Sequence, residues 1–315
     1  LGMHGSPTCE LVYKNAKAEL CGSTRLGLIK YVMALMNGAR LGIAAQSTGL
    51  SQAAYDEAIA YARDRKQFGQ AIINFPAVYD MLSRMKAKLD AGRAILYQTA
   101  RYVDIYKQLD DIERERKLTP EEKAEQRLYS KMADALTPMA KGMGSEYANQ
   151  NAYDCIQIHG GSGFIMEYKA QRLYRDARIF SIYEGTTQLQ VVAAIRYIMN
   201  GTYLQLIDEM LERSYKPEYA DLVEKIRAMR VQLGEAIDKV KADADKDEQD
   251  YLGRRLYEMT GTTLMSLLLL DDATRAPELF ERSLRVYVPM VEAEVAMHHH
   301  FVMNFSAAML DNYRQ

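Results

Sequence analysis

The sequence predicts an all-α chain: an antiparallel bundle similar to a four-helix bundle, then a second helical bundle, with a short β remnant at the N-terminus. Apolar residues recur every three or four positions over most of the 315 residues, the spacing of one face of a helix. Proline and capping residues mark several helix starts, and no strand pattern follows residue 20. The predicted domains are residues 1–22, 23–203 and 204–315.

The first predicted elements are a strand-like segment and a long helix. Strand-like residues occupy Cys9–Tyr13. The pattern over Arg25–Arg65 is helical, with Leu28 and Ile29 on its apolar face and many small residues later. Small residues allow close helix packing, and the pair Phe68-Gly69 is expected to end this helix.

Two further long helices follow. Pro76 is acceptable in a first helical turn, and apolar residues recur from there to Tyr106. Thr119-Pro120-Glu121-Glu122 combines an N-cap, a proline at the first position and a glutamate at the third, so another helix begins there. The mixed-charge residues from Asp110 up to that point are interpreted as a solvated loop.

The part from Leu204 onward is predicted to be helical throughout. Two helices are expected around Tyr251–Leu270 and Pro277–Leu310, with Pro289 as a kink in the second. An earlier helix in this part has one clear apolar face, formed by Leu222, Val223, Ile226, Met229, Leu233, Ile237 and Val240.

Composition excludes several classes of protein. The net charge of −2 excludes a strongly basic nucleic-acid-binding surface, and no apolar run approaches the length of a membrane span. From Leu204 there are 14 Lys+Arg against 21 Asp+Glu, and the preceding part has 26 against 21. This mildly basic front part suits an anionic ligand, although a solvated charge imbalance explains it equally well.

The cysteines and the first residues indicate a compartment and a longer parent. Cys9, Cys21 and Cys155 have neither an even count nor metal-ligand spacing, so they are interpreted as free thiols in a reducing compartment, the cytoplasm. The opening Leu1-Gly2-Met3 is not an ordinary start, and we expect the chain to be part of something longer.

Two polar segments stand out from the helical pattern. Ile182–Gln190 places one carboxylate, Glu184, just before a helix, with Thr186 or Thr187 as its N-cap. About twenty residues earlier, Gln157–Phe164 is a glycine-rich bend where bare backbone could approach a ligand.

These segments resemble the acyl-CoA dehydrogenase family, flavoenzymes that introduce an α,β double bond into acyl-CoA thioesters. Tyr61–Gly69 resembles the family's arginine-x-x-phenylalanine-glycine motif, and Arg175-Asp176-Ala177 precedes the glutamate as in the family. The resemblance covers residues 1–203 and implies that residues 1–22 are the end of a middle β domain. The remainder resembles an extra helical domain of some members.

The resemblance implies that Glu184 is the base that removes the α proton. A carboxylate is a weak base in water, so water must be excluded when the acyl chain enters. The other reading is a solvent-facing glutamate near a helix N-terminus. Some members carry the base at the position of Ala39, and alanine cannot take a proton.

The resemblance also implies FAD as cofactor and an acyl-CoA as substrate. Arg65 would bind the pyrophosphate across a subunit interface, although it could also simply complement a helix C-terminus. Pro76 departs from the family, which commonly has glutamine there. The remaining implied contacts are Gln67, Phe68, Gln157, Gly160, Gly161, Thr186 and Gln188 for the cofactor, and Asn37, Arg40 and Gly185 for the substrate.

Partners follow from the same resemblance. It implies a homodimer or larger assembly, because Arg65 and Gln157 serve the neighbouring subunit, and an electron-transferring flavoprotein as electron acceptor. His298-His299-His300 is not expected to bind metal, because adjacent helical side chains diverge by about 100°. The alternative function is a non-catalytic helical scaffold that binds a partner. The chain by itself is expected to be inactive and to hold FAD weakly or not at all.

Overall fold

The structure of the protein is a computed structural model that describes residues 1–25, 27, 32–243 and 245–313. Helices make up most of these residues, which confirms the predicted all-α class. Leu28 and Ile29, which the sequence assigns to the first helix, lie outside the described residues. The predicted boundaries at 22/23 and 203/204 stay predictions.

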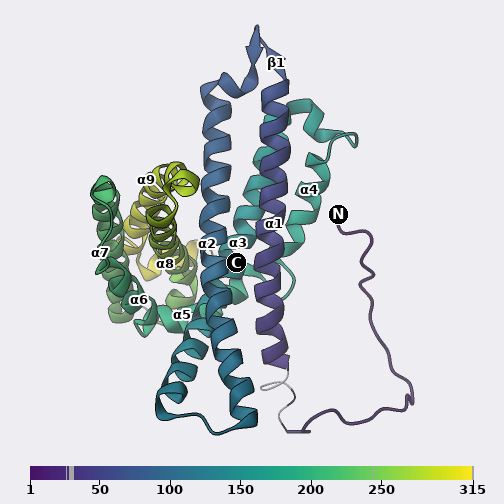
Figure 1. Cartoon of the computed structure of the whole chain (residues 1–315), viewed down its shortest axis with the longest axis vertical. Coiled ribbons are helices and arrows are strands. Elements are labelled where there is room, and N and C mark those ends of the chain that lie inside the picture. Colours follow the sequence, from purple (N-terminus) through teal and green to yellow (C-terminus); the bar gives the residue numbers. More distant parts are fainter. Residues whose placement is uncertain (26, 28–31, 244, 314–315) are drawn as a thin grey trace.

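Three long helices form the elongated bundle of Figure 1: α1 (Met33–Asp64), α2 (Pro76–Glu115) and α3 (Pro120–His159). Pro76 is the first residue of α2, as predicted. Thr119 and Glu122 form both hydrogen bonds of a capping box at the start of α3, which confirms that signal. Ala54 and Ala58 on α1 are fully buried, because small side chains let the helices approach closely. Shorter elements complete this bundle: η2 (Ile72–Asn74), η3 (Gly160–Phe164), α4 (Ala170–Ala177) and η4 (Arg178–Ser181).

A small hairpin caps one end of the bundle, at the top of Figure 1. Strands β1 (Lys66–Gln67) and β2 (Gln70–Ala71) pair antiparallel, so the prediction of no strand after residue 20 is wrong there. Phe68 and Gly69 have φ angles of 48° and 83°, and two left-handed residues make the tight turn that joins paired strands. Cys9–Tyr13 forms no strand, because its exposed backbone has no neighbouring strand to pair with.

The charged stretch before Thr119 is mostly helix, which corrects the predicted loop. Helix α2 continues to Glu115, so only Arg116–Thr119 connects it to α3. Lys123 of α3 forms an ion pair with Glu113 of α2 at 2.6 Å. The charges therefore join two helices at their ends, a long-range pairing that the local sequence did not reveal.

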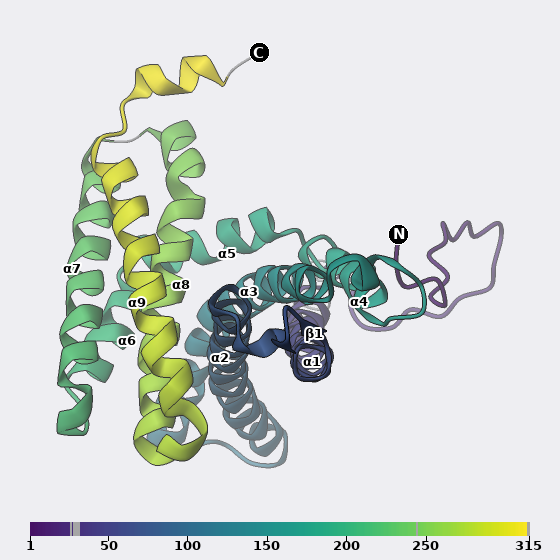
Figure 2. The same cartoon turned by 90° about the horizontal axis from the view of Figure 1, so that it is seen from above.

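Helix α5 (Thr187–Met199) completes the first half of the chain. The second half contains α6 (Thr202–Leu211), η5 (Pro217–Tyr219), α7 (Ala220–Asp243), α8 (Lys246–Arg275) and α9 (Pro277–Met303), followed by η6 (Ala307–Asn312). Seen from above in Figure 2, α6–α9 lie to one side of α1–α4. Helix α9 continues through Pro289, and the kink stays a prediction. The predicted apolar face of α7 is confirmed, since Leu222, Ile226, Met229, Leu233, Ile237 and Val240 are buried and Val223 packs against the core.

The second half packs directly onto α3. The Tyr257 hydroxyl donates to the carbonyl oxygens of Pro138 at 2.9 Å and Met139 at 3.2 Å. Gly142 makes this approach possible, because a Cβ there would lie 2.1 Å from the Tyr257 hydroxyl oxygen. The largest core cluster accordingly contains residues from both halves. Within the described ranges, no helix is long and apolar enough to cross a bilayer.

Candidate active site

Glu184 lies on a short loop between η4 and α5, residues 182–186, which is named the base loop. The φ angle of Glu184 is 54°, and Gly185 follows with a φ of 87°. A glutamate in this left-handed region is uncommon, and such strain concentrates at functional sites. The two left-handed residues turn the chain sharply, so that α5 begins directly after the candidate base.

The loop is held through its backbone carbonyls. Arg40 of α1 donates Nε–H to the carbonyl of Glu184 at 3.3 Å. The Gly185 carbonyl accepts from Lys141 Nζ of α3 at 2.6 Å and from Gln190 Nε2 of α5 at 2.9 Å. Three helices therefore fix the loop without using the Glu184 side chain.

The Glu184 carboxylate remains available to a ligand. Among the residues that the structure describes, it accepts no hydrogen bond and forms no ion pair, and Glu184 is partly exposed. Burial lowers the pKa of Arg40, and the Glu184 charge acts in the opposite direction. A carboxylate with no hydrogen-bond or ion-pair partner of its own can accept a proton from a bound molecule.

Lys141 is a site residue that the sequence analysis missed. Its side chain is fully buried, and burial lowers its pKa to about 8, with Arg40 acting in the same direction and Glu146 and Glu184 against it. The sequence held a signal for it: Lys141 is the one charged residue in Ala135–Ser145, a helical stretch of small and apolar residues. Buried lysines need a partner, and here the partner is a loop carbonyl.

Replacing Lys141 by methionine is expected to change how stability depends on pH. The folded-state pKa of about 8 lies below the ordinary 10.5, so the folded chain binds fewer protons between these values. The stability contributed by Lys141 is therefore present above pH 10.5 and is lost as the pH falls through 8. Urea unfolding between pH 8 and pH 10.5 should show the unfolding free energy of the wild type rising by about 3 kcal/mol relative to that of the variant. A constant difference at every pH would contradict the expectation.

The structure decides between the two threonines that could cap α5. Thr186 is the N-cap, and its hydroxyl accepts from the Leu189 amide at 3.3 Å. Thr187 is buried and donates instead to Glu146 of α3 at 2.7 Å. Thr186 and Gln188 both face solvent beside Glu184.

The candidate substrate residues on α1 are joined to one another. Asn37 accepts from Arg40 Nη1 at 3.4 Å and donates to Asp134 of α3 at 3.2 Å. Gly185 lies against the same group, because a Cβ there would be 3.6 Å from Arg40 Nη2. Asn37, Arg40 and Gly185 are thus brought together with Glu184.

Arg65, Gln67 and Phe68 lie at the hairpin end of α1. Arg65 caps α1 through its amide, which donates to the Tyr61 carbonyl at 2.9 Å. All three side chains are exposed, and Phe68 is 94% exposed and makes an edge contact with Phe75. An aromatic ring this exposed is available to a ligand or to another chain.

Gln157, Gly160 and Gly161 lie at the end of α3, at the same end of the bundle as that hairpin. Gly160 has a φ of 58°, and a Cβ at either glycine would meet nothing within 4 Å. The space above this backbone is therefore open to a ligand. A hydrogen bond of 3.2 Å from the Tyr61 hydroxyl to Ser162 joins the end of α1 to this bend.

The candidate residues consequently form two groups rather than one. Helix α1 contacts the base loop at Arg40 and ends at Arg65, a distance of about 37 Å at 1.5 Å per residue. Thr186 and Gln188 belong to the group beside Glu184, whereas Arg65 and Gln157 belong to the group at the hairpin end. The family resemblance had already assigned Arg65 and Gln157 to a neighbouring subunit, and the structure adds how far along α1 they lie from Glu184.

The three adjacent histidines diverge. His298 Nε2 lies 3.0 Å from Glu258, and His299 Nε2 lies 2.8 Å from Glu235. His300 contacts Asn304, the C-cap residue of the same helix, α9. Within the described residues, no three or more His, Cys, Asp or Glu side chains are grouped so that they could hold a metal ion.

Two family models match the chain. One, described as the acyl-CoA dehydrogenase C-terminal domain, matches residues 29–198, and one described as acyl-CoA dehydrogenase C terminal matches residues 199–310. The fold and the candidate site define a helical domain that holds an unpaired carboxylate at a helix N-terminus. The chain belongs to the acyl-CoA dehydrogenase family.

Two relatives show how much of a family member the chain covers. The 3-(aryl)acrylate reductase of Clostridium sporogenes is 37% identical over 193 residues, which are 60% of this chain and 45% of that protein. The caffeyl-CoA reductase-Etf complex subunit CarC of Acetobacterium woodii is 36% identical over 194 residues, 60% of this chain and 44% of that protein. The chain spans less than half the length of these curated relatives.

A solved structure has the same fold. The crystal structure of an acyl-CoA dehydrogenase complexed with FAD from Bacillus anthracis superposes with a TM-score of 0.68 at 21% identity. The match covers 90% of this chain and 51% of that one, so it includes both helical halves.

Proposed function

We propose that this chain supplies the catalytic base of an FAD-dependent acyl-CoA dehydrogenase, an oxidoreductase acting on a CH–CH bond of an acyl-CoA thioester. The observation that carries the proposal is the unpaired Glu184 carboxylate on a loop that is fixed through its backbone. In this proposal the chain is the helical C-terminal part of a longer protein. Most of the β domain and the N-terminal part lie in the rest of that protein.

In the proposed reaction, Glu184 removes the proton from the carbon next to the thioester carbonyl. FAD, when bound, supplies the acceptor for the hydride from the β carbon. Arg40, Asn37 and Gly185 line the substrate side, and Arg40 holds the Glu184 backbone while the proton moves. Exclusion of water by the acyl chain strengthens the carboxylate as a base.

The exposed groups at the hairpin end fit a flavin dinucleotide. The Arg65 guanidinium suits bidentate contact with a pyrophosphate, and the bare backbone at Gly160 and Gly161 has open space above it. Gln67 and Gln157 add exposed amides, and Phe68 adds an exposed ring. Thr186 and Gln188 would contact a flavin at the base loop instead.

The separation of the two groups supports a homodimer or larger assembly. Because about 37 Å of α1 divides them, the hairpin group would serve the cofactor of a neighbouring subunit while the base loop serves its own. The second helical half would then cover the surface on which smaller members form tetramers. The molecular mass measured by light scattering at micromolar concentration is expected to exceed that of one chain. A monomer mass would contradict the pairing of subunits.

An electron-transferring flavoprotein is the proposed electron acceptor. Support comes from the relative whose name places it in a reductase-Etf complex. The proposed compartment is the reducing cytoplasm, supported by the unpaired Cys9, Cys21 and Cys155.

The test is flavin bleaching by acyl-CoA in the longer protein. We expect it to purify with flavin and to lose the flavin absorbance when a suitable acyl-CoA of a chain-length series is added without oxidant. The alternative is a helical scaffold that binds a partner and performs no chemistry. A colourless preparation that no acyl-CoA changes would favour that scaffold.

A further inference from the structure

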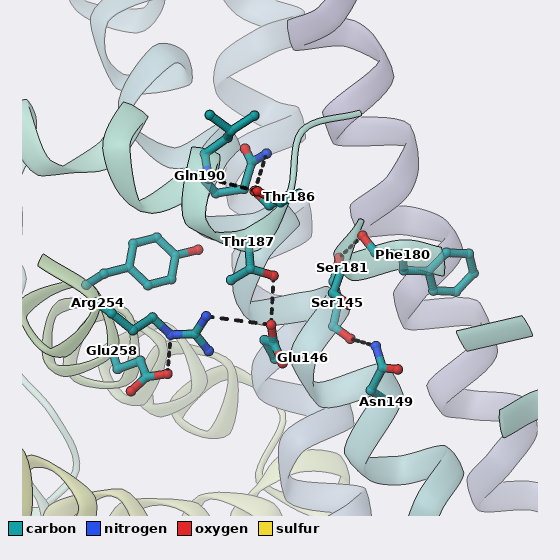
Figure 3. Close-up of polar contacts among 12 residues, drawn as sticks. Ser145, Glu146, Asn149, Phe180, Ser181, Thr186, Thr187, Gln190, Arg254 and Glu258 are labelled. Atoms are coloured by element: carbon teal, nitrogen blue, oxygen red, sulfur yellow. Dashed lines mark hydrogen bonds and ion pairs between the residues drawn. The ribbon is translucent and has the colours of Figure 1, made fainter. Parts of the chain in front are cut away.

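A line of polar contacts connects the second helical half to the first turn of α5. Figure 3 shows Thr187, Glu146, Arg254 and Glu258 in sequence along this line. The Thr187 hydroxyl donates to Glu146 Oε1 at 2.7 Å, and Arg254 Nη1 lies 3.7 Å from the same oxygen. Glu146 stands on α3, Thr187 on α5 and Arg254 on α8. The line therefore crosses from one half of the chain to the other.

The far end of the line holds Arg254 in place. Arg254 Nε donates to Glu258 Oε1 at 2.5 Å, and His298 of α9 lies 3.0 Å from the other Glu258 oxygen. Burial raises the pKa of Glu258, but the hydrogen bond from His298 and the charge of Arg254 outweigh burial and lower it overall. Burial lowers the pKa of Arg254, and the two glutamates outweigh that effect. The pair is thus charged, and its geometry comes from α8 and α9.

The near end of the line sits at the start of the helix that follows the base. Thr187 is the first residue of α5, and Glu184 stands three residues before it. The Glu146 carboxylate accepts from Thr187 at the N-terminal end of α5. A carboxylate at this end of a helix interacts favourably with the helix dipole and with unpaired amides. A partly buried carboxylate requires a counter-charge, and Arg254 is the cation paired with Glu146.

We propose that the second helical half positions the base loop through Arg254, which orients Glu146 beneath the first turn of α5. Arg254 is a positioning residue in this proposal, because it acts through Glu146 and Thr187 and touches no substrate. The link between the two halves stands on the contacts alone. Its effect on catalysis rests on the proposed function.

Amide hydrogen exchange of this chain tests the link without any flavin. The reporters are the Leu189 amide, bonded to the Thr186 hydroxyl, and the Gln190 amide, bonded to the Thr186 carbonyl at 3.1 Å. Arg254→Met is expected to speed their exchange by about tenfold relative to wild type. Arg254→Lys keeps the charge and should restore most of the protection.

The matched control is Arg285→Met. Arg285 also pairs with a glutamate one helical turn away, Glu281, and its side chain is 42% exposed against 35% for Arg254. Its other contacts among the described residues are the Glu218 carbonyl and the Tyr219 ring, which both belong to the second half. Exchange at the start of α5 should not change in this variant.

A double-mutant comparison separates positioning from general loss of stability. Glu146→Gln keeps an acceptor for Thr187 but removes the charge, and combining it with Arg254→Met should add little to either change alone. The proposal is overturned if Arg254→Met leaves the α5 amides unchanged, or if it speeds exchange equally along α1 and α3. If Arg254→Met does not fold, Arg254→Lys and Glu146→Gln decide the same question.

Flavin reduction in the longer protein gives the second readout. Arg254→Met should slow reduction at saturating substrate and leave KM unchanged, while Arg285→Met behaves as wild type. If exchange responds but the wild type never reduces flavin, the proposed function fails and the link stands. If the wild type reduces flavin but exchange does not respond, only the link fails.

Discussion

Replacing Glu184 by glutamine in the longer, flavin-loaded protein is expected to slow flavin reduction by acyl-CoA about 10³-fold, within the range for loss of a general base. The amide has nearly the same shape as the carboxylate, but it cannot accept the α proton. Stopped-flow absorbance of the flavin measures the rate directly. The length of the acyl chain has no bearing on this comparison, provided both proteins receive the same substrate.

The same replacement should leave the fold and the bound flavin intact. The loop is held by Arg40, Lys141 and Gln190 through carbonyl oxygens, and the Glu184 side chain has no partner among the described residues. The unfolding free energy should therefore change by no more than about 0.5 kcal/mol. Glu224→Gln, at an exposed position on α7, is the control for removing a negative charge. Normal reduction in Glu184→Gln would show that the base is elsewhere.

The second large effect is expected in the 315-residue chain itself, which should fold but bind FAD several decades more weakly than the longer protein. The candidate cofactor residues are exposed and lie in two groups about 37 Å apart along α1, so each group offers one wall of a site. The contacts that the rest of the longer protein would make with FAD are lost, which costs several kcal/mol of binding free energy. Each 1.4 kcal/mol is a tenfold loss of affinity.

Folding of the chain without flavin has a separate physical basis. The core is built from helix packing, and the largest buried cluster joins α2 and α3 to α5–α9 without any sheet. Titration of the purified chain with FAD, followed by flavin fluorescence, measures the affinity, and circular dichroism checks the fold. The matched comparison is the longer protein at the same concentration. A yellow chain with stoichiometric flavin after gel filtration would contradict this prediction.

Local sequence signals determined where several of the helices begin. The capping box at Thr119 and Glu122 and the proline at Pro76 act within one helical turn, so they need no partner from elsewhere in the chain. The apolar face of α7 was equally clear, since its period of three to four residues reports which side is buried. The sequence also placed Glu184 just before a helix N-terminus, and the structure confirms that position.

Local signals failed where the neighbouring residues fitted two different structures equally well. Thr186 and Thr187 are equally good caps by sequence, and the choice depends on Glu146, which binds Thr187 from 41 residues away. The segment Asp110–Glu115 carries charges suited to a loop, yet Lys123 and Gln126 of α3 draw it into the helical bundle. The turn at Phe68-Gly69 formed a hairpin because its flanking residues could pair with each other.

By itself, the sequence determined the helical class and predicted the candidate base and the candidate cofactor residues. Only the tertiary structure decided that Lys141 holds the base loop, that Arg254 of the second half contacts Glu146 of α3, and how far apart along α1 the two groups of cofactor candidates lie. The physical reason is the range of the interactions. Capping and amphipathic periodicity act over a few residues, whereas these contacts join helices whose packing depends on complementary side chains far apart in the chain.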